Sequence, residues 1–290
     1  MKSYCRERER RRQPKGNLGS GSTEPLPKSR YWVIIRTHYR NLPHSIILPL
    51  MGNERRSYDV KFYRQLETTK ESAREILPIV FDLLKPASMV DIGCGAGHWL
   101  AAAIELGVSD VLGVDGDWAL KAKLEIPREK FLVHDLSAPL KLSRKFELAL
   151  CLEVAEHLPA AQARTFVQSL CDAADRILFS AAIPGQGGRH HVNEQWPAYW
   201  AGLFAEGGFE CYDVLRPRIW SNPRVLWYYG QNCLIFARRG TLASTAVATT
   251  PLSLVHPELW SAQVARLNSP GKLLERLPKA VLSRLRREGR

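Results

Sequence analysis

Short apolar runs alternate with segments of helical spacing through the middle of the chain, and this alternation constrains the fold most. The apolar runs lie at 88–92, 110–114, 131–134, 146–152 and 176–181. Helical spacing of apolar residues occurs at 72–85, 97–106, 118–124 and 160–174. Because parallel strands need a crossover to return the chain, we expect a mostly parallel sheet covered by helices on both faces.

The pattern changes towards the end of this region. A helix is predicted over 196–205, and strands follow at 209–215 and 232–237 with no convincing helix between them. Two successive strands without a helical crossover are expected to be antiparallel. The sequence therefore predicts an α/β fold in which the last strand runs against the others.

Composition divides the chain into four regions. Residues 1–30 combine basic residues, Gly-Ser repeats and three prolines, which predicts a disordered tail. We expect residues 31–70 to be an extension that packs near the active site, and residues 71–240 to form the main domain. Residues 241–290 are interpreted as a linker and a basic amphipathic segment.

The net charge of +12 lies almost entirely in the two ends of the chain. Residues 1–30 carry a net +6 and residues 272–290 a net +5, which leaves +1 for residues 31–271. A nearly neutral central region argues against a large footprint on duplex nucleic acid. The basic ends remain candidates for contact with RNA or with an anionic membrane surface.

Cellular location is predicted from what the sequence lacks. No apolar stretch approaches the ~20 residues of a membrane span, and no signal-peptide pattern follows the N-terminal charges. The six cysteines are scattered without a CxxC pair, which is typical of reduced thiols. We expect a cytoplasmic protein without a transmembrane segment; the sequence does not indicate its oligomeric state.

The stretch "VDIGCGAGHW", residues 90–99, reads as a strand, a glycine turn and the start of a helix. Gly93 and Gly95 let the backbone approach a ligand, and Gly97 allows close helix packing. The G-x-G-x-G spacing is one residue shorter than the pattern that binds a pyrophosphate. Asp91 would repel a pyrophosphate, whereas it would attract an ammonium or sulfonium group.

Two further acids end the next two strands. Asp115, twenty residues after Gly95, can accept hydrogen bonds from both hydroxyls of a ribose. Asp135 can accept from an adenine amino group while Leu136 packs against the ring. Three acids at successive strand ends indicate a nucleoside site at the carboxyl edge of the sheet.

These motifs, together with "LEVAEHL" at residues 152–158, resemble the class I S-adenosylmethionine-dependent methyltransferases over roughly residues 70–240. The resemblance implies a Rossmann-like, doubly wound seven-stranded sheet with an antiparallel last strand, S-adenosylmethionine as cofactor and methyltransferase activity. It assigns the methionine part to Asp91 and the glycine turn, the ribose to Asp115 and the adenine to Asp135. The full expected cofactor set is Asp91, Gly93, Cys94, Gly95, Gly97, Asp115, Gly116, Asp135, Leu136 and Leu152.

Two carboxylates and an imidazole follow the strand at 146–152, and three interpretations of them stay open. Glu153, Glu156 and His157 have the i, i+3, i+4 spacing of one helical face. His157 can be a general base for a substrate hydroxyl. The three can also bind Mg²⁺ or Mn²⁺ together with His191, an arrangement that resembles methyltransferases of small-RNA 3′ ends and of ubiquinone synthesis. Finally, Glu156 and His157 can simply pair and cap a helix.

Substrate contacts are expected from two later segments. The stretch 181–200 offers His190, His191, Asn193 and Glu194 in a glycine-rich loop, and the aromatic residues after it are interpreted as core. Arg216, Arg218 and Arg224 lie among aromatics, which suits a sugar, a phosphate or an RNA end, although a twisted hairpin packed on the sheet is the more usual explanation.

Three functions follow from these expectations. The first is O-methylation of a hydroxyl on a small molecule or glycan. The second is metal-assisted RNA 2′-O-methylation, and the third is a cofactor-binding module without catalysis.

Overall fold

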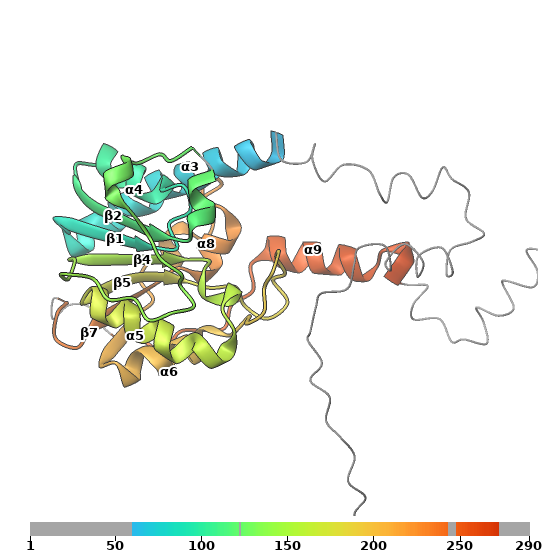
Figure 1. Ribbon diagram of the computed structural model, residues 1–290. Coiled ribbons are helices and arrows are strands. Elements are labelled where there is room, and N and C mark those ends of the chain that lie inside the picture. The colour runs from blue at the N-terminus through green and yellow to red at the C-terminus, as the bar shows by residue number, and fades with distance from the viewer. Residues whose placement is uncertain (1–59, 122, 243–247, 273–290) are drawn as a thin grey trace, which may run out of the picture. The chain divides into compact units, whose positions relative to one another are not determined.

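Seven strands form a single sheet in the computed structural model, which describes residues 60–121, 123–242 and 248–272 (Figure 1). The strand order is β3-β2-β1-β4-β5-β7-β6, and every pairing is parallel except those of β7, which is antiparallel to β5 and β6. The strands are β1 (Ser88–Ile92), β2 (Asp110–Asp115), β3 (Phe131–Val133), β4 (Leu148–Leu152), β5 (Arg176–Ser180), β6 (Phe209–Tyr212) and β7 (Leu234–Arg238). The predicted seven-stranded, mostly parallel sheet is confirmed.

Helices cover both faces of this sheet. The α-helices are α3 (Val60–Leu84), α4 (His98–Glu105), α5 (Ala163–Ala173), α6 (Pro197–Glu206), α7 (Arg216–Ile219), α8 (Trp227–Asn232) and α9 (Pro257–Leu267). The short 3₁₀ turns are η1 (Asp117–Lys121), η2 (Arg128–Lys130), η3 (Ala155–His157) and η4 (Ala160–Gln162). Helices α3, α4 and α8 lie on one face and α5 and α6 on the other (Figure 1). Among the described helices, none combines the length and apolar character that a membrane span requires.

Burial explains why the central strands are mostly apolar. Every residue of β1 and of β4 is buried, because these strands have neighbours on both sides and helices on both faces. Ile76 and Leu77 of α3 are fully buried in the layer of one face. Phe204 of α6 occupies the layer of the other face, where its ring stacks on Phe236 of β7 at 4.0 Å between centroids. The sheet is thus held between two apolar layers.

Two expectations about helices are wrong. Where the segment expected to be a helix at 118–124 is described, residues 118–121 belong to the turn η1 and residues 123 and 124 are irregular. Two helices, α7 and α8, lie between β6 and β7, where no helix was expected. Helices of four and six residues are too short to display a helical period in the sequence. Burial of Ile219 and Tyr229 in the core holds them instead.

The described part of the C-terminal region packs against the domain. Thr249 N–H donates to the Cys211 carbonyl at 2.8 Å. Arg216 Nη1 donates to the Leu252 carbonyl at 2.9 Å. His256 N–H donates to Gln231 Oε1 at 2.8 Å. Residues 249–256 therefore contact β6, α7 and α8 where a linker was expected, whereas the predicted tail at 1–30 and the segment after 272 lie outside the described residues.

Candidate active site

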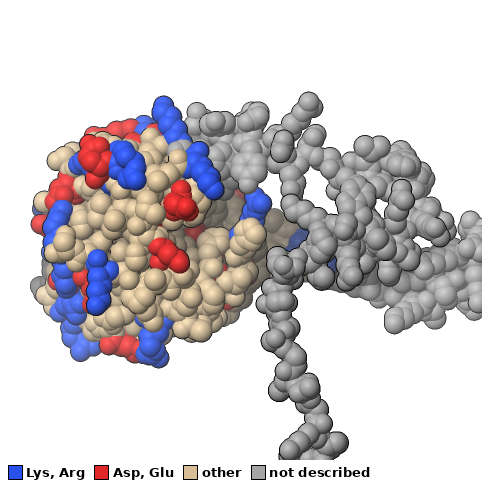
Figure 2. Space-filling view, viewed as in Figure 1, with Lys and Arg blue, Asp and Glu red and all other residues tan. Residues whose placement is uncertain are grey.

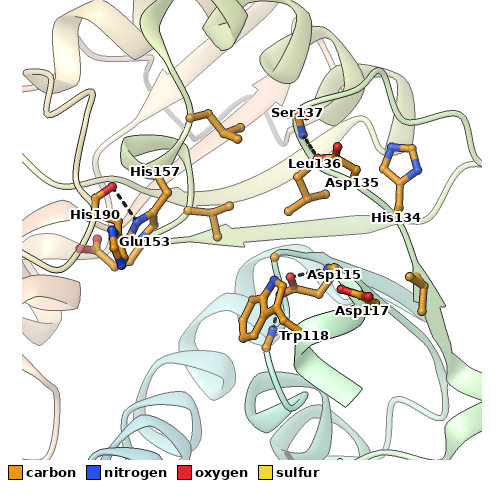
Figure 3. Close-up of a pocket in the computed structure, with 16 residues that line it drawn as sticks. Asp115, Asp117, Trp118, His134, Asp135, Leu136, Ser137, Glu153, His157 and His190 are labelled. Carbon is orange, nitrogen blue, oxygen red and sulfur yellow. Dashed lines mark hydrogen bonds between the residues drawn. The ribbon is translucent and has the colours of Figure 1, made fainter. Parts of the chain in front are cut away.

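A cavity of about 860 Å³ opens at the carboxyl ends of the central strands. It extends from the acids that follow β2 and β3 to the segment that follows β4 (Figure 3). The residues that line it are Gly93, Gly95, Asp115, Gly116, Asp117, Trp118, Val133, His134, Asp135, Leu136, Ser137, Glu153, Val154, His157, Leu158 and His190. Its position is the one expected for a ligand site in an open α/β sheet.

The glycine turn after β1 uses conformations that L side chains rarely adopt. Gly93, Gly95 and Gly97 have φ angles of 90°, 54° and 88°. A Cβ atom at Gly93 would overlap the side chain of Val154, so this glycine lets the turns after β1 and β4 pack together. A Cβ atom at Gly95 would meet no atom within 4 Å and would enter the cavity. Gly95 therefore leaves its backbone open to a ligand.

Asp115 connects two turns of the backbone. Its Oδ2 accepts a hydrogen bond from Gly95 N–H and its Oδ1 accepts one from Gly116 N–H, both at 2.7 Å. Burial raises the pKa of Asp115, and these two hydrogen bonds lower it in part. The carboxylate is thus held at the cavity wall, at the end of β2, where a ribose was expected.

Asp91 lies beneath the cavity wall and is only 2% exposed. Burial, and then the nearby charge of Asp115, raise its pKa from 3.8 to about 7. A positively charged ligand group above it would lower this pKa again. The site thus fits the ammonium and sulfonium groups of S-adenosylmethionine.

The part of the cavity wall formed after β2 and β3 combines an aromatic ring with polar groups. Trp118 is 58% exposed, and it lines the cavity together with Val133 and Leu136. Asp135 Oδ1 accepts a hydrogen bond from Ser137 N–H at 2.9 Å, and Ser137 keeps the pKa of Asp135 low. Apolar side chains beside an ionised carboxylate suit a flat heterocycle with an amino group. The sequence did not single out Trp118, because an aromatic residue after a strand carries no periodic signal.

The structure divides the expected cofactor residues into two groups. Gly93, Gly95, Asp115, Gly116, Asp135 and Leu136 line the cavity. Asp91, Cys94, Gly97 and Leu152 are not among the lining residues and are buried behind them. Among the sixteen lining residues four are Asp or Glu and none is Lys or Arg, which suits a cationic nucleoside better than a pyrophosphate.

Glu153 follows β4 directly and turns the chain with a φ of 56°. Its Oε2 accepts from Gln186 Nε2 at 2.7 Å and its Oε1 accepts from Asn232 Nδ2 at 3.0 Å. Burial raises the pKa of Glu153, and the amide donors lower it in part. The helical turn begins only at Ala155, so Glu153 does not share a helical face with the next two predicted residues.

Glu156 and two histidines lie close together beside Glu153. One donor atom each of Glu156, His157 and His191 lies within 4.8 Å of the others, and Glu153 is not part of this group. Glu156 is fully buried, and neither of its carboxyl oxygens has a hydrogen-bond partner among the described residues. Burial, and then the charge of Glu153, raise its pKa to about 9. The carboxyl group therefore fits either a proton or a metal ion.

His157 reaches the cavity from the end of η3. Its Nδ1 lies 3.4 Å from the His190 carbonyl, which can only accept, so we assign the proton to Nδ1. Burial, and then the neighbouring His191, lower the pKa of His157. The His157 ring thus lies at one end of the cavity, across from Asp115, Trp118 and Asp135 (Figure 3).

Two of the three arginines proposed as substrate contacts are engaged elsewhere. Arg216 is 1% exposed and pairs with Asp213. Arg224 pairs with Glu75 of α3 at 2.8 Å. Neither side chain lines the cavity. The expectation of core packing is confirmed for Trp200, which is 2% exposed.

The comparisons with known proteins agree with the fold. A family model described as a methyltransferase domain matches residues 63–212. No curated protein matches the sequence.

Similar solved structures include magnesium protoporphyrin IX methyltransferase ChlM from Synechocystis PCC 6803, with 19% identity, a TM-score of 0.42 and coverage of 71% of this chain and 99% of that one. The small RNA methyltransferase HEN1 has 14% identity, a TM-score of 0.43 and coverage of 63% and 27%. An enzyme described as a pericyclic reaction enzyme has 19% identity, a TM-score of 0.40 and coverage of 52% and 43%. The chain thus spans less than half the length of the last two.

The assignment rests on the family match. The match begins within α3 and ends with β6, so it includes the glycine turn, the strand-end acids and the segment after β4 that form the cavity. Because it covers 150 of the 290 residues, the chain belongs to the family of methyltransferase domains that this model describes.

Proposed function

We propose that this methyltransferase transfers a methyl group to a neutral hydroxyl of a small molecule or glycan, and that His157 takes up the hydroxyl proton. The observation that carries the proposal is the single cavity that contains Asp115 and Asp135 at one end and His157 at the other. Bound S-adenosylmethionine supplies an electrophilic methyl group, so the chain itself has to align the acceptor and accept a proton.

The charge of the cavity favours a neutral acceptor. A carboxylate or phosphate acceptor would meet four carboxyl side chains among the lining residues and no Lys or Arg. Such like-charge contact in a partly dry site costs free energy. A hydroxyl carries no charge until it loses its proton, and the free Nε2 of His157 is suited to remove that proton.

Substitution of His157 tests the proposal. We expect wild-type protein to form S-adenosylhomocysteine with hydroxylated metabolites or glycans and not with carboxylate acceptors. His157→Ala is expected to lower kcat by about 10²- to 10⁴-fold, the usual contribution of a general base, with the Kd for S-adenosylmethionine nearly unchanged. Full turnover in His157→Ala would exclude this residue as the base. Cofactor binding without turnover on any acceptor would favour the binding-module alternative.

A metal-assisted RNA 2′-O-methyltransferase is the second candidate, favoured by one observation. The donor atoms of Glu156, His157 and His191 lie close together, and both Glu156 carboxyl oxygens lack a partner in the described structure. These three residues would hold a Mg²⁺ or Mn²⁺ ion, which supplies Lewis acidity to a hydroxyl. Glu153 is less suited to a fourth position, because its two oxygens accept from Gln186 and Asn232.

Glu156→Gln separates the two candidates, because glutamine matches the protonated carboxyl in shape and is a poor metal ligand. If His157 acts as a base without metal, we expect turnover within about threefold of wild type and no effect of chelator. If a metal is required, we expect a loss on the scale of other ligand substitutions, about 10²-fold or more, and loss of turnover in EDTA that Mn²⁺ restores. The assay uses both a hydroxylated small molecule and a short RNA.

A further inference from the structure

The loop between β5 and α6 is curled around one carboxylate. Gly185 N–H donates to Glu194 Oε2 and Gly187 N–H donates to Glu194 Oε1, both at 2.7 Å. The two glycines have φ angles of 85° and 73°, which place their N–H groups on the same side of the loop. The shape of this loop thus depends on Glu194.

The same carboxylate holds His191. Its Nδ1 lies 3.0 Å from Glu194 Oε1, and a carboxylate can only accept, so the proton is assigned to Nδ1. The other ring nitrogen, Nε2, lies 4.0 Å from Glu156 Oε1. A Cβ atom at Gly188 would overlap the His191 ring, so the ring rests directly on this glycine.

The loop in turn contacts His157 in two ways. The His190 carbonyl lies 3.4 Å from His157 Nδ1. The His191 ring packs edge to face against the His157 ring, with centroids 4.9 Å apart and an interplanar angle of 87°. The N–H groups of Val192 and Asn193 also donate to the Glu156 carbonyl at 2.9 and 3.0 Å, which joins the loop to η3. The orientation of His157 is therefore determined largely by a segment about 33 residues away.

We propose that Glu194 is a positioning residue for methyl transfer: it holds the 185–191 loop and the His191 ring in the arrangement that directs His157 towards the acceptor. Glu194 does not line the cavity, so it acts without touching cofactor or acceptor. The inference rests on the role of His157 proposed above.

The contacts at position 194 require a carboxylate side chain. Three donors share two carboxylate oxygens. The side chains of His191 and Glu194 are only 12% and 19% exposed, so water replaces the contact between them poorly, whereas the two glycine N–H groups are exposed. Glu194→Gln keeps the length but turns one acceptor oxygen into a donor amide that faces an N–H group. Glu194→Ala removes all three contacts. The loop is then expected to lose its closed form while β5 and α6 remain packed.

Kinetics of matched variants test the proposal. We expect Glu194→Ala and Glu194→Gln to lower kcat by about 10- to 100-fold, the range for residues that orient a ligand or base, with acceptor KM and cofactor Kd within about twofold. Gly188→Ala leaves Glu194 in place but displaces the His191 ring, so it should also lower kcat. Gly202→Ala is the matched control, because a Cβ atom there meets no atom within 4 Å; wild-type kcat is expected. Circular dichroism and Tm verify folding of each variant.

A measurement without substrate separates failure of this inference from failure of the proposed function. Nitrogen-15 NMR of the imidazoles should find His191 as the Nδ1–H tautomer in wild type, and a shift towards the Nε2–H tautomer in Glu194→Ala. This result would support the role of Glu194 even if no hydroxyl acceptor were methylated. If Glu194→Ala kept both the tautomer and kcat while His157→Ala lost activity, the inference would be overturned and the proposed function would stand.

Discussion

Asp91 is a buried carboxyl group whose ionised form a positively charged ligand would stabilise. It is 2% exposed, and after burial the charge of a second carboxylate, Asp115, raises its pKa further. Burial of a carboxyl group beside a like charge favours its protonated form. A bound cation would reverse that preference. The residue therefore destabilises the ligand-free protein at high pH and is expected to favour cofactor binding.

Asp91→Asn should separate these two effects. The folded-state pKa of about 7 exceeds the ordinary 3.8, so the folded protein binds the proton more tightly and loses stability as pH rises from about 4 through 7. The amide carries no charge, so at pH 8 ligand-free Asp91→Asn is expected to be more stable than wild type by up to about 4 kcal/mol, the equivalent of three pKa units. The two proteins should converge near pH 4.

Thermal unfolding across pH and calorimetric titration with S-adenosylmethionine check this prediction. Cofactor affinity should fall by at least about tenfold in Asp91→Asn, because an ionised partner for the ligand cation is lost. Asp82→Asn, a change at an exposed acid of α3, controls for net charge. A lower stability of Asp91→Asn at pH 8 combined with unchanged cofactor binding would refute the role assigned to Asp91.

At the scale of elements, the strands were predicted from the sequence more accurately than the short helices. Strands β1 and β4 are buried at every residue. Strand β4 is an uninterrupted apolar run and β1 is apolar apart from Ser88 and Asp91, so both can be recognised from the sequence. Helices α7 and α8 span four and six residues, less than two turns, and their stability comes from the residues they bury. Such short helices depend on tertiary packing, which cannot be predicted from the periodicity of apolar residues in the sequence.

The same distinction applies to the site. Asp115 and Asp135 could be predicted because the topology brings the carboxyl ends of parallel strands to one edge. The contacts of Glu153 could not be predicted, because Gln186 and Asn232 lie 33 and 79 residues away in the sequence, in irregular or short segments. Glu194 was noted only as a polar loop residue. Its contacts with two glycine N–H groups depend on left-handed backbone that the sequence permits but does not specify.

Substitution of Arg216 tests whether an arginine of the 216–232 segment stabilises the fold. Arg216 pairs with Asp213 and donates to the carbonyls of Leu252 and Gln231, so it joins α7 to α8 and to the C-terminal segment. Arg216→Ala leaves the Asp213 carboxylate, which is 13% exposed, and the buried Gln231 without this donor, and it is expected to lower the free energy of unfolding by about 3–5 kcal/mol. Arg224→Ala removes a pair whose arginine is 64% exposed and should cost less than about 1 kcal/mol.

Urea unfolding of the two variants measures this difference. Both are expected to bind S-adenosylmethionine like wild type at temperatures where they are folded, because neither arginine lines the cavity. If Arg216→Ala were as stable as Arg224→Ala but failed to turn over the acceptor, the first interpretation of Arg216 as a substrate contact would be restored.

For the whole molecule, the distribution of charge bears on the choice of acceptor. Residues 31–271 carry a net charge of only +1, whereas residues 1–30 and 272–290 carry +6 and +5. On the face shown in Figure 2, Lys and Arg are interspersed with Asp and Glu over the described domain. Mixed charge of this kind gives weak, non-directional attraction for a polyanion. Affinity for RNA would therefore have to come mainly from the two ends of the chain.

Deletion of residues 1–30 separates an RNA substrate from a small one. The deletion removes nine Lys and Arg and three Glu and leaves the basic residues of 272–290, so salt-dependent binding of a short labelled RNA, followed by fluorescence anisotropy, should weaken and lose about half of its dependence on salt. Turnover of a hydroxylated small molecule should stay within about twofold of the full chain, because an uncharged acceptor gains nothing from phosphate contacts. If instead RNA is the acceptor, kcat/KM for RNA should fall steeply with both deletion and added salt. That result would favour the RNA 2′-O-methyltransferase and count against a neutral small acceptor.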